Sequence, residues 1–187
     1  LTDIQDDFAK REGLLFVGGF AHPPNADAVL WFAREVFPKI RAELPEIKFY
    51  VVGSKVTEEI KALAQPDNGI VIKGFVSEEE LARLYATCKV VVVPLRYGAG
   101  VKGKVVEAIY NGAPIVTTAT GAEGIPFVDQ VLKIADGAEN FASATISLYR
   151  DNTRCRQLCH RTQDYIRKHF SLDGAWEVVR GDFSRHD

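Results

Sequence analysis

Apolar residues along this 187-residue chain form two alternating patterns. Short uninterrupted apolar runs are typical of strands buried on both faces, and apolar residues at every third or fourth position are typical of amphipathic helices. The apolar runs predict six strands, at Leu14–Phe20, Ile47–Val52, Ile70–Lys73, Lys89–Pro94, Ile115–Thr118 and Val131–Ala135. The periodic segments predict helices at 26–44, 56–64, 77–87, 102–111, 139–149, 154–169 and 173–183. This alternation predicts an α/β fold in which a doubly wound parallel sheet is followed by C-terminal helices.

Capping and breaking residues mark the ends of these helices. Asn25 is expected to be the N-cap of the first helix, and Pro38 is expected to cost stability inside it. Ser77 followed by Glu80 is a capping box at the start of the third helix. Gly112 is expected to end the helix that begins near residue 102.

Residues 89–125 contain the main candidate site. A buried strand leads into a loop with Gly98, Gly100 and Gly103, and a helix follows. The N–H groups of a first helical turn and the positive end of the helix dipole both favour a phosphate. Lys102 and Lys104 place positive charge at this end, where the dipole gives it no stabilising role. The stretch therefore predicts an anion site.

Glu107 lies four residues beyond Gly103, which in a helix is about 6 Å along the axis. A carboxylate can accept two hydrogen bonds from a vicinal diol such as that of a ribose. Together these groups predict a nucleotide at the carboxyl edge of the sheet, where doubly wound folds bind ligands. The loops at 18–25, 74–76, 95–104 and 119–124 are expected at the same edge.

Composition excludes several other classes of protein. The chain is 47% apolar and 26% charged, as in an ordinary globular domain. A net charge of -2 gives no electrostatic footprint for nucleic acid. The apolar runs are too short for a transmembrane helix, and the first residues lack the pattern of a signal peptide. Three cysteines, an odd number, fit a reducing compartment, so we expect a cytoplasmic protein.

A metal site is not expected. Cys155 and Cys159 have the spacing of metal ligands on one helix face, but the sequence holds no second pair of matching spacing, which favours ordinary thiols. Clustered carboxylates near the predicted phosphate position are also missing from the sequence. We therefore expect neither a metal nor another cofactor.

The order of short motifs along the chain points to a family. These motifs are Phe16-Val17-Gly18, Asn25, Val52-Gly53, Gly74-Phe75-Val76 with Glu79 and Leu81, Pro94-Leu95, Glu107-Ala108 and Gly112-Ala113-Pro114-Ile115-Val116-Thr117. In this order they resemble the C-terminal, donor-binding half of a GT-B glycosyltransferase. The resemblance is closest to the retaining family 4 within the glycosyl transferases group 1, and it covers about residues 14–170.

The resemblance implies a Rossmann-like domain that binds the nucleotide part of a nucleotide-sugar donor, a UDP- or GDP-sugar, without a metal. Glu107 would hold the ribose, while Gly100 and the following amide of Val101 would hold the diphosphate. The loop with Phe75 and Val76 would meet the base through backbone groups. The other residues expected to bind the donor are Gly19, His22, Arg96, Lys102, Lys104 and Glu123.

Two departures from the family pattern stand in this sequence. Family members commonly have a glutamate eight positions before the ribose-binding one, where it touches the transferred sugar, and this chain has Ala99. They also commonly have Arg and Lys after the first strand, where Gly19 and Pro24 stand here. Our hypothesis is that Arg96, Lys102 and Lys104 supply the missing charge. For Arg96, pairing with a neighbouring carboxylate is an open alternative, and both lysines could be ordinary surface charges.

The sequence and the resemblance together predict how the chain is divided into parts. Residues 1–13 are expected to be a lead-in, 14–153 the nucleotide-sugar-binding domain and 154–187 a helical tail. The chain has no methionine, so we expect a fragment whose natural start lies upstream. In GT-B enzymes the acceptor site and catalytic groups lie largely in the N-terminal domain, so this fragment is expected to transfer nothing alone.

Two alternatives stay open at this point. The chain could be a non-catalytic nucleotide-binding or interaction domain, or one half of a GT-B nucleotide-sugar 2-epimerase. The full-length enzyme could also lie at the periphery of the inner membrane, as enzymes with lipid-linked acceptors do.

Overall fold

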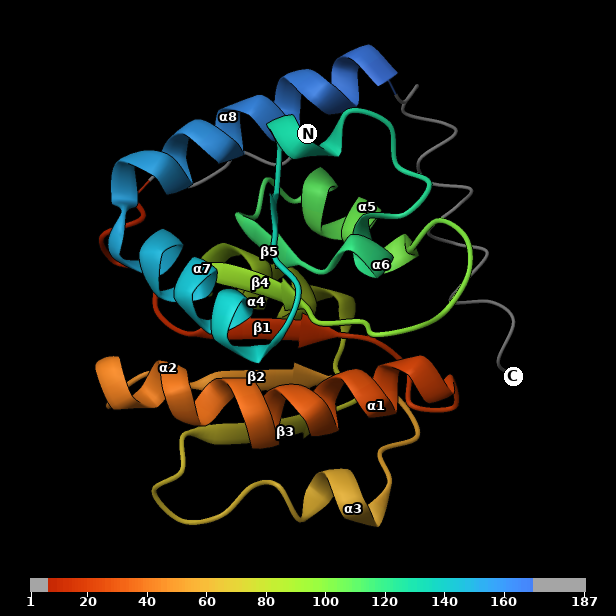
Figure 1. Cartoon of the computed structure of the whole chain (residues 1–187), viewed down its shortest axis with the longest axis vertical. Coiled ribbons are helices and arrows are strands. Elements are labelled where there is room, and N and C mark those ends of the chain that lie inside the picture. The colour runs from red at the N-terminus through yellow and green to blue at the C-terminus, as the bar shows by residue number, and fades with distance from the viewer. Residues whose placement is uncertain (1–6, 170–187) are drawn as a thin grey trace.

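The computed structural model describes residues 7–169, which are built around a six-stranded sheet (Figure 1). Its spatial order is β3-β2-β1-β4-β5-β6, and every neighbouring pair is parallel. The strands are β1 Leu14–Val17, β2 Phe49–Val52, β3 Ile70–Gly74, β4 Val90–Val93, β5 Ile115–Thr117 and β6 Lys133–Ile134. This order reverses between β1 and β4, which confirms the predicted doubly wound α/β fold.

Helices cover both faces of the sheet. They are α1 Pro23–Trp31, the π-helical η1 Phe32–Val36, α2 Phe37–Glu43, α3 Glu58–Lys61, α4 Glu78–Thr87, α5 Gly103–Tyr110, α6 Ala119–Ala122, the 3₁₀ turn η2 Val128–Gln130, α7 Ala138–Arg150 and α8 Asn152–His169. Figure 1 shows α1, α2 and α7 on the near face, and α8 packs against both α5 and α7. The helix predicted at 173–183 lies outside the described residues.

The first helix starts earlier than predicted, and Asn25 is not its N-cap. Helix α1 begins at Pro23 after His22, because proline at the first helical position has a suitable φ and lacks only an N–H that the helix does not use. Asn25 instead lies within the first turn, 4% exposed, and its side-chain amide donates to the Gly19 carbonyl at 2.7 Å. This bond ties α1 to the loop that leaves β1.

A π-helical turn directly precedes Pro38 inside the first helix. The chain stays helical from Pro23 to Glu43, but residues 32–36 are π-helical and the Phe37 N–H donates to the Phe32 carbonyl. A proline inside an α-helix lacks one N–H and clashes with the carbonyl four residues earlier. The wider turn just before Pro38 relieves that conflict without ending the helix.

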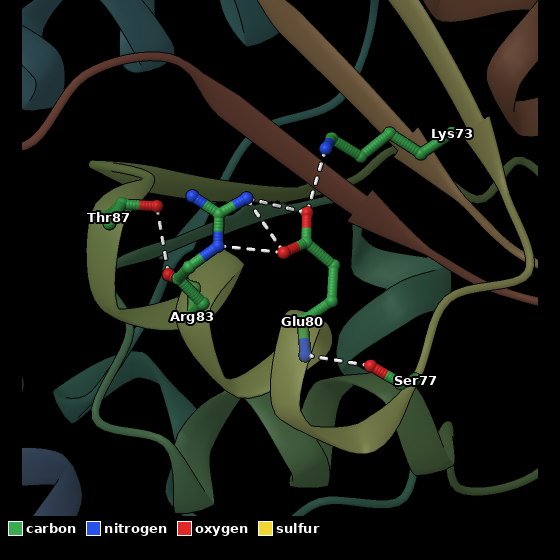
Figure 2. A network of polar contacts seen from close by, with 5 residues as sticks. All are labelled: Lys73, Ser77, Glu80, Arg83 and Thr87. Carbon is green, nitrogen blue, oxygen red and sulfur yellow. Dashed lines mark hydrogen bonds and ion pairs between the residues drawn. The ribbon is translucent and has the colours of Figure 1, made fainter.

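Helix α4 begins at its predicted cap, but the capping box is only half formed. Ser77 Oγ accepts from the Glu80 N–H at 3.2 Å, as predicted. The Glu80 carboxylate turns away from Ser77 and accepts from Lys73 at 2.8 Å and from Arg83 at 2.7 Å (Figure 2). Lys73 is on β3, so this ion pair joins the two ends of the loop Gly74–Val76.

Aromatic rings fill the space between the sheet and its helices. The Phe32 and Phe49 ring centroids are 4.6 Å apart, and Phe141 of α7 packs edge-on against Phe32. The lead-in takes part as well, since Phe8 is fully buried and the Arg11 guanidinium lies 4.3 Å from its ring centroid. The thiols of Cys155 and Cys159 are also buried, which agrees with a packing role.

Candidate functional site

Three of the four predicted ligand loops, 18–25, 95–104 and 119–124, lie against one another at the carboxyl edge of the sheet. Residues 95–102, here called the glycine loop, join β4 to α5 and pass beside α1 (Figure 1). A Cβ placed on Gly98 would lie 3.5 Å from the Pro24 ring, and one on Gly124 would lie 3.0 Å from Val101. The glycine loop is therefore packed between the start of α1 and the segment that follows α6. Residues 119–122, expected as loop, form the short helix α6.

Helix α5 begins at Gly103, close to the predicted start. Its N-cap, Lys102, has an extended backbone, and the Lys102 side chain makes no capping hydrogen bond. The Val105 N–H already donates to the Lys102 carbonyl at 2.9 Å, so the remaining N–H groups belong to the first two residues of the helix. This end of α5 faces the glycine loop and favours an anion through its dipole.

Glu107 is partly buried one turn further along α5. Burial raises the pKa of this carboxyl group to about 7, while the Lys104 ammonium and the Tyr85 hydroxyl act in the opposite direction. Tyr85 comes from α4, is 3% exposed, and its hydroxyl makes no hydrogen bond of good geometry among the described residues. Glu107 therefore lies near a cation and a hydroxyl in a poorly hydrated position, where its carboxylate could accept hydrogen bonds from a diol.

Lys104 reaches from α5 across to the end of β1. Its Cε lies 3.0 Å from the position that a Cβ on Gly18 would take, and the Asn25 amide nitrogen lies equally close. Any larger residue at position 18 would displace both side chains. The Asn25 side-chain oxygen is buried without a hydrogen-bond partner, so an unused acceptor lies beside the Lys104 stem.

Lys102 lies beneath the glycine loop. Its side chain is 7% exposed, and its ammonium donates to the carbonyls of Gly98 at 3.0 Å and Gly100 at 2.5 Å. Glu123, after α6, lies 3.5 Å from the same ammonium. The positive charge of Lys102 is thus placed against the inner side of the loop.

Arg96 pairs with a carboxylate, which is the alternative that the sequence left open. Its guanidinium donates through two nitrogens to the carboxylate of Asp27 on α1, with one distance of 2.9 Å, and lies 5.7 Å from the Trp31 ring centroid. This pair links the start of the glycine loop to α1. A second role toward a phosphate stays a prediction.

The remaining predicted residues also lie at carboxyl ends of strands. Gly19 follows β1, and His22 is the exposed N-cap of α1. Phe75 and Val76 follow β3, and the Phe75 ring is 78% exposed. Within residues 7–169 the structure holds no group of three or more His, Cys, Asp or Glu side chains that could bind a metal ion.

The sequence pattern does not indicate the roles of three residues in this region. It predicts a cap at Asn25, and it does not single out Tyr85 or Asp27. The position of Asn25 after Pro23-Pro24 was the available signal, because proline at the first helical position moves the cap back to residue 22. Tyr85 and Asp27 depend on packing between helices far apart in sequence, for which the sequence has no local signal.

Comparison with known proteins agrees with this fold. The sequence profile described as "Glycosyl transferases group 1" matches residues 11–151. A Klebsiella pneumoniae protein, the "uncharacterized 44.6 kDa protein in cps region", is 29% identical over 172 residues, which are 89% of this chain and 44% of that protein. The chain therefore spans less than half the length of this relative.

Solved structures show the same architecture at low identity. A mutant of TarM from S. aureus, crystallised with fondaparinux, α-GlcNAc-glycerol and UDP, superposes with a TM-score of 0.69 at 15% identity, covering 94% of this chain and 36% of that one. The catalytic domain of the cholesterol-α-glucosyltransferase from Helicobacter pylori superposes with a TM-score of 0.64 at 17% identity. The match covers 84% of this chain and 98% of that one. In the part of the chain that the structure describes, no helix has the length and apolar character needed to cross a membrane. The profile match over most of the chain, together with the fold, shows that the protein belongs to the glycosyl transferases group 1 family and has the fold of a GT-B glycosyltransferase domain.

Proposed function

We propose that this domain binds the nucleoside diphosphate part of a nucleotide-sugar donor for a retaining glycosyltransferase. The observation that carries the proposal is the arrangement on α5, where Glu107 and Lys104 lie one turn apart behind an uncapped helix start. The helix start and Lys104 suit a diphosphate, and Glu107 suits the ribose diol. The base would lie toward the loop Gly74–Val76 at the far side of the same edge.

The chemical role of such a site is to stabilise the leaving diphosphate. As the bond from the sugar to the diphosphate breaks, negative charge grows on the phosphate oxygens. Backbone N–H groups and an ammonium that are already in position stabilise that charge without further rearrangement. Glu123, beside the glycine loop, is the proposed contact to the transferred sugar, since Ala99 has no polar group to offer.

The other substrates and partners follow from the family. A UDP-sugar is the first candidate donor, since TarM was crystallised with UDP, and a GDP-sugar is the second. The acceptor would bind a second, N-terminal domain of the same protein, which would supply most catalytic groups. We propose a cytoplasmic enzyme that needs no metal and contacts the inner membrane where its acceptor is lipid-linked.

Titration with nucleotides tests the proposal. UDP, GDP, ADP, dTDP and CMP are screened by thermal shift against this chain, and the best ligand is then titrated calorimetrically. One nucleoside diphosphate should raise the melting temperature by mass action. Glu107→Gln should weaken its binding by about tenfold or more, because a hydrogen bond to a charged group is worth about 1.5–3 kcal/mol.

Glu46→Gln is the matched control, because Glu46 is exposed before β2, at the opposite edge of the sheet. This variant should bind as the unaltered chain does. If none of the five nucleotides binds, or if Glu107→Gln binds equally well, the proposal is wrong.

Ala99 favours a second candidate, a non-catalytic nucleotide-binding domain that keeps the fold. The two candidates differ in how they treat the sugar. A donor domain should bind the intact nucleotide sugar differently from the free diphosphate, and Glu123→Gln should remove that difference. A domain that binds only the nucleotide should show no such difference in either protein.

A further inference from the structure

Lys102 occupies an unusual position for a lysine at a helix start. Its ammonium is buried and is bound by two carbonyls of the glycine loop, those of Gly98 and Gly100. A buried charge is costly unless it is paired and hydrogen-bonded. Both carbonyls and the Glu123 carboxylate at 3.5 Å meet that requirement. Lys102 is therefore part of the loop's interior and does not lie on the surface that a ligand approaches.

The direction of the two carbonyls determines the direction of two N–H groups. All described peptide bonds are trans, so the C=O and N–H of one peptide unit point in opposite directions. The Gly98 carbonyl shares its unit with the Ala99 N–H, and the Gly100 carbonyl shares its unit with the Val101 N–H. Because both carbonyls point at the ammonium, both N–H groups point away from it, and Ala99 and Val101 are exposed residues.

The backbone of the loop is adapted to this arrangement. Gly98 has φ +118° and Gly100 has φ +78°, values that residues other than glycine rarely adopt. The residues whose carbonyls bind Lys102 are thus the two that need glycine for their conformation. N–H groups that point to the same side of a turn, as those of Ala99 and Val101 do, line a concavity that favours anions.

We propose that Lys102 is a positioning residue whose buried ammonium binds the Gly98 and Gly100 carbonyls and so turns the Ala99 and Val101 N–H groups toward the donor diphosphate. This inference rests on the proposed function and changes the expected role of Lys102. The lysine acts through the loop, whereas Lys104 contacts the phosphates directly. The Glu123 carboxylate pairs with the same ammonium at 3.5 Å, which joins the loop to the segment after α6.

The test compares binding of a nucleoside diphosphate with binding of the corresponding nucleoside. UDP with uridine and GDP with guanosine are titrated against the unaltered chain, Lys102→Met and Lys48→Met. Lys48 is the control because it is exposed at the amino end of β2, on the opposite edge of the sheet. Lys102→Met should bind the nucleoside diphosphate at least about tenfold more weakly, because the variant loses the charge-assisted hydrogen bonds that hold the phosphate-binding loop. Its affinity for the nucleoside should not change, because the nucleoside has no phosphate to contact that loop.

Amide resonances give a second measurement. In the unaltered chain the diphosphate should slow hydrogen exchange at the Ala99 and Val101 amides, and Lys102→Met should lose this protection. If Lys102→Met fails to fold, Glu123→Gln removes one partner of the ammonium at an exposed position. It should weaken diphosphate binding by about twofold to fivefold, because partly exposed ion pairs contribute little.

The outcomes separate this inference from the proposed function. If the unaltered chain binds neither diphosphate, both are wrong. If it binds one of them and Lys102→Met binds that ligand as tightly, or loses the nucleoside and the diphosphate equally, the positioning role of Lys102 is wrong and the proposed function stands.

Discussion

Arg96 in the glycine loop forms a two-point ion pair with Asp27 on α1, across a sequence separation of 69 residues. Bidentate pairing of this kind fixes the orientation as well as the distance of the two groups. Together with Lys102 and Glu123 on the other side, it holds the loop at both flanks. The arrangement explains how a loop with two glycines can still present a defined set of N–H groups.

The Arg96–Asp27 pair should therefore affect binding more than stability. Asp27→Asn should weaken nucleoside diphosphate binding by several-fold because the loop loses one anchor, while unfolding free energy should fall by less than about 1 kcal/mol, as for an exposed pair. Calorimetry and chemical denaturation measure the two effects. Glu43→Gln breaks the Arg150–Glu43 pair, which is more exposed and lies away from the glycine loop, and should leave binding unchanged. Equal binding by both variants would contradict an anchoring role.

The raised pKa of Glu107 predicts a pH-dependent contribution to stability. Because the folded-state pKa of about 7 exceeds the ordinary carboxyl value of 4.5, the folded protein holds this proton more tightly than the unfolded chain. The contribution is complete below about pH 4.5 and is lost as the pH rises through about 7. It should amount to at most about 3.5 kcal/mol, since each pKa unit corresponds to about 1.4 kcal/mol.

Denaturation of the unaltered chain and of Glu107→Gln from pH 4.5 to 8 isolates this effect. As the pH rises, the unfolding free energy of the unaltered chain should fall relative to that of Glu107→Gln. A difference that does not change over this interval would mean that Glu107 is better solvated than the structure indicates.

Ligand binding should follow pH in the opposite direction. A ribose diol donates hydrogen bonds, so it needs Glu107 as a carboxylate, which forms above a pKa of about 7. Nucleoside diphosphate affinity should rise by about tenfold from pH 6 to pH 8 in the absence of other titrations. The phosphate of the ligand also titrates in this range. Glu107→Gln serves as the control, because the pH dependence of its affinity comes from the phosphate alone. An identical pH profile in both proteins would exclude a contact between Glu107 and the diol.

Close packing beneath the site predicts a sharp difference between two glycines. A Cβ on Gly53 would lie 2.0 Å from the Gly18 carbonyl oxygen, and backbone must move to accommodate it. Gly53→Ala should therefore destabilise the fold by about 2–4 kcal/mol. Gly19→Ala meets only the Ser54 hydroxyl at 3.2 Å and should cost much less in the same denaturation experiment. Similar losses in both variants would contradict this account of the packing.

The fold can be predicted from the sequence because the signals for its strands and helices lie in residues that are close together along the chain. Buried strands such as Val90–Val93 and the Ser77 cap of α4 depend on neighbouring residues, and both appear where the pattern predicts them. The strand–helix alternation then leaves few topologies. The π-turn lies directly before Pro38, the residue at which the sequence predicts a cost in helix stability.

The side chains of the site were less predictable, because their directions depend on distant contacts. The sequence places Lys102 and Lys104 two residues apart at one helix start, yet the first lies beneath the loop and the second reaches β1. The sequence predicts a cap at Asn25, whose side-chain amide instead donates to the Gly19 carbonyl. In each case the deciding partner belongs to another turn or another element, and helical periodicity contains no information about it.

A crystal structure of this chain with the nucleoside diphosphate that stabilises it most tests the central claim directly. We predict the diphosphate against the N–H groups of the glycine loop and the first turn of α5, with both ribose hydroxyls on the Glu107 carboxylate. A nucleotide bound elsewhere on the domain, or one whose ribose lies away from Glu107, would contradict the account.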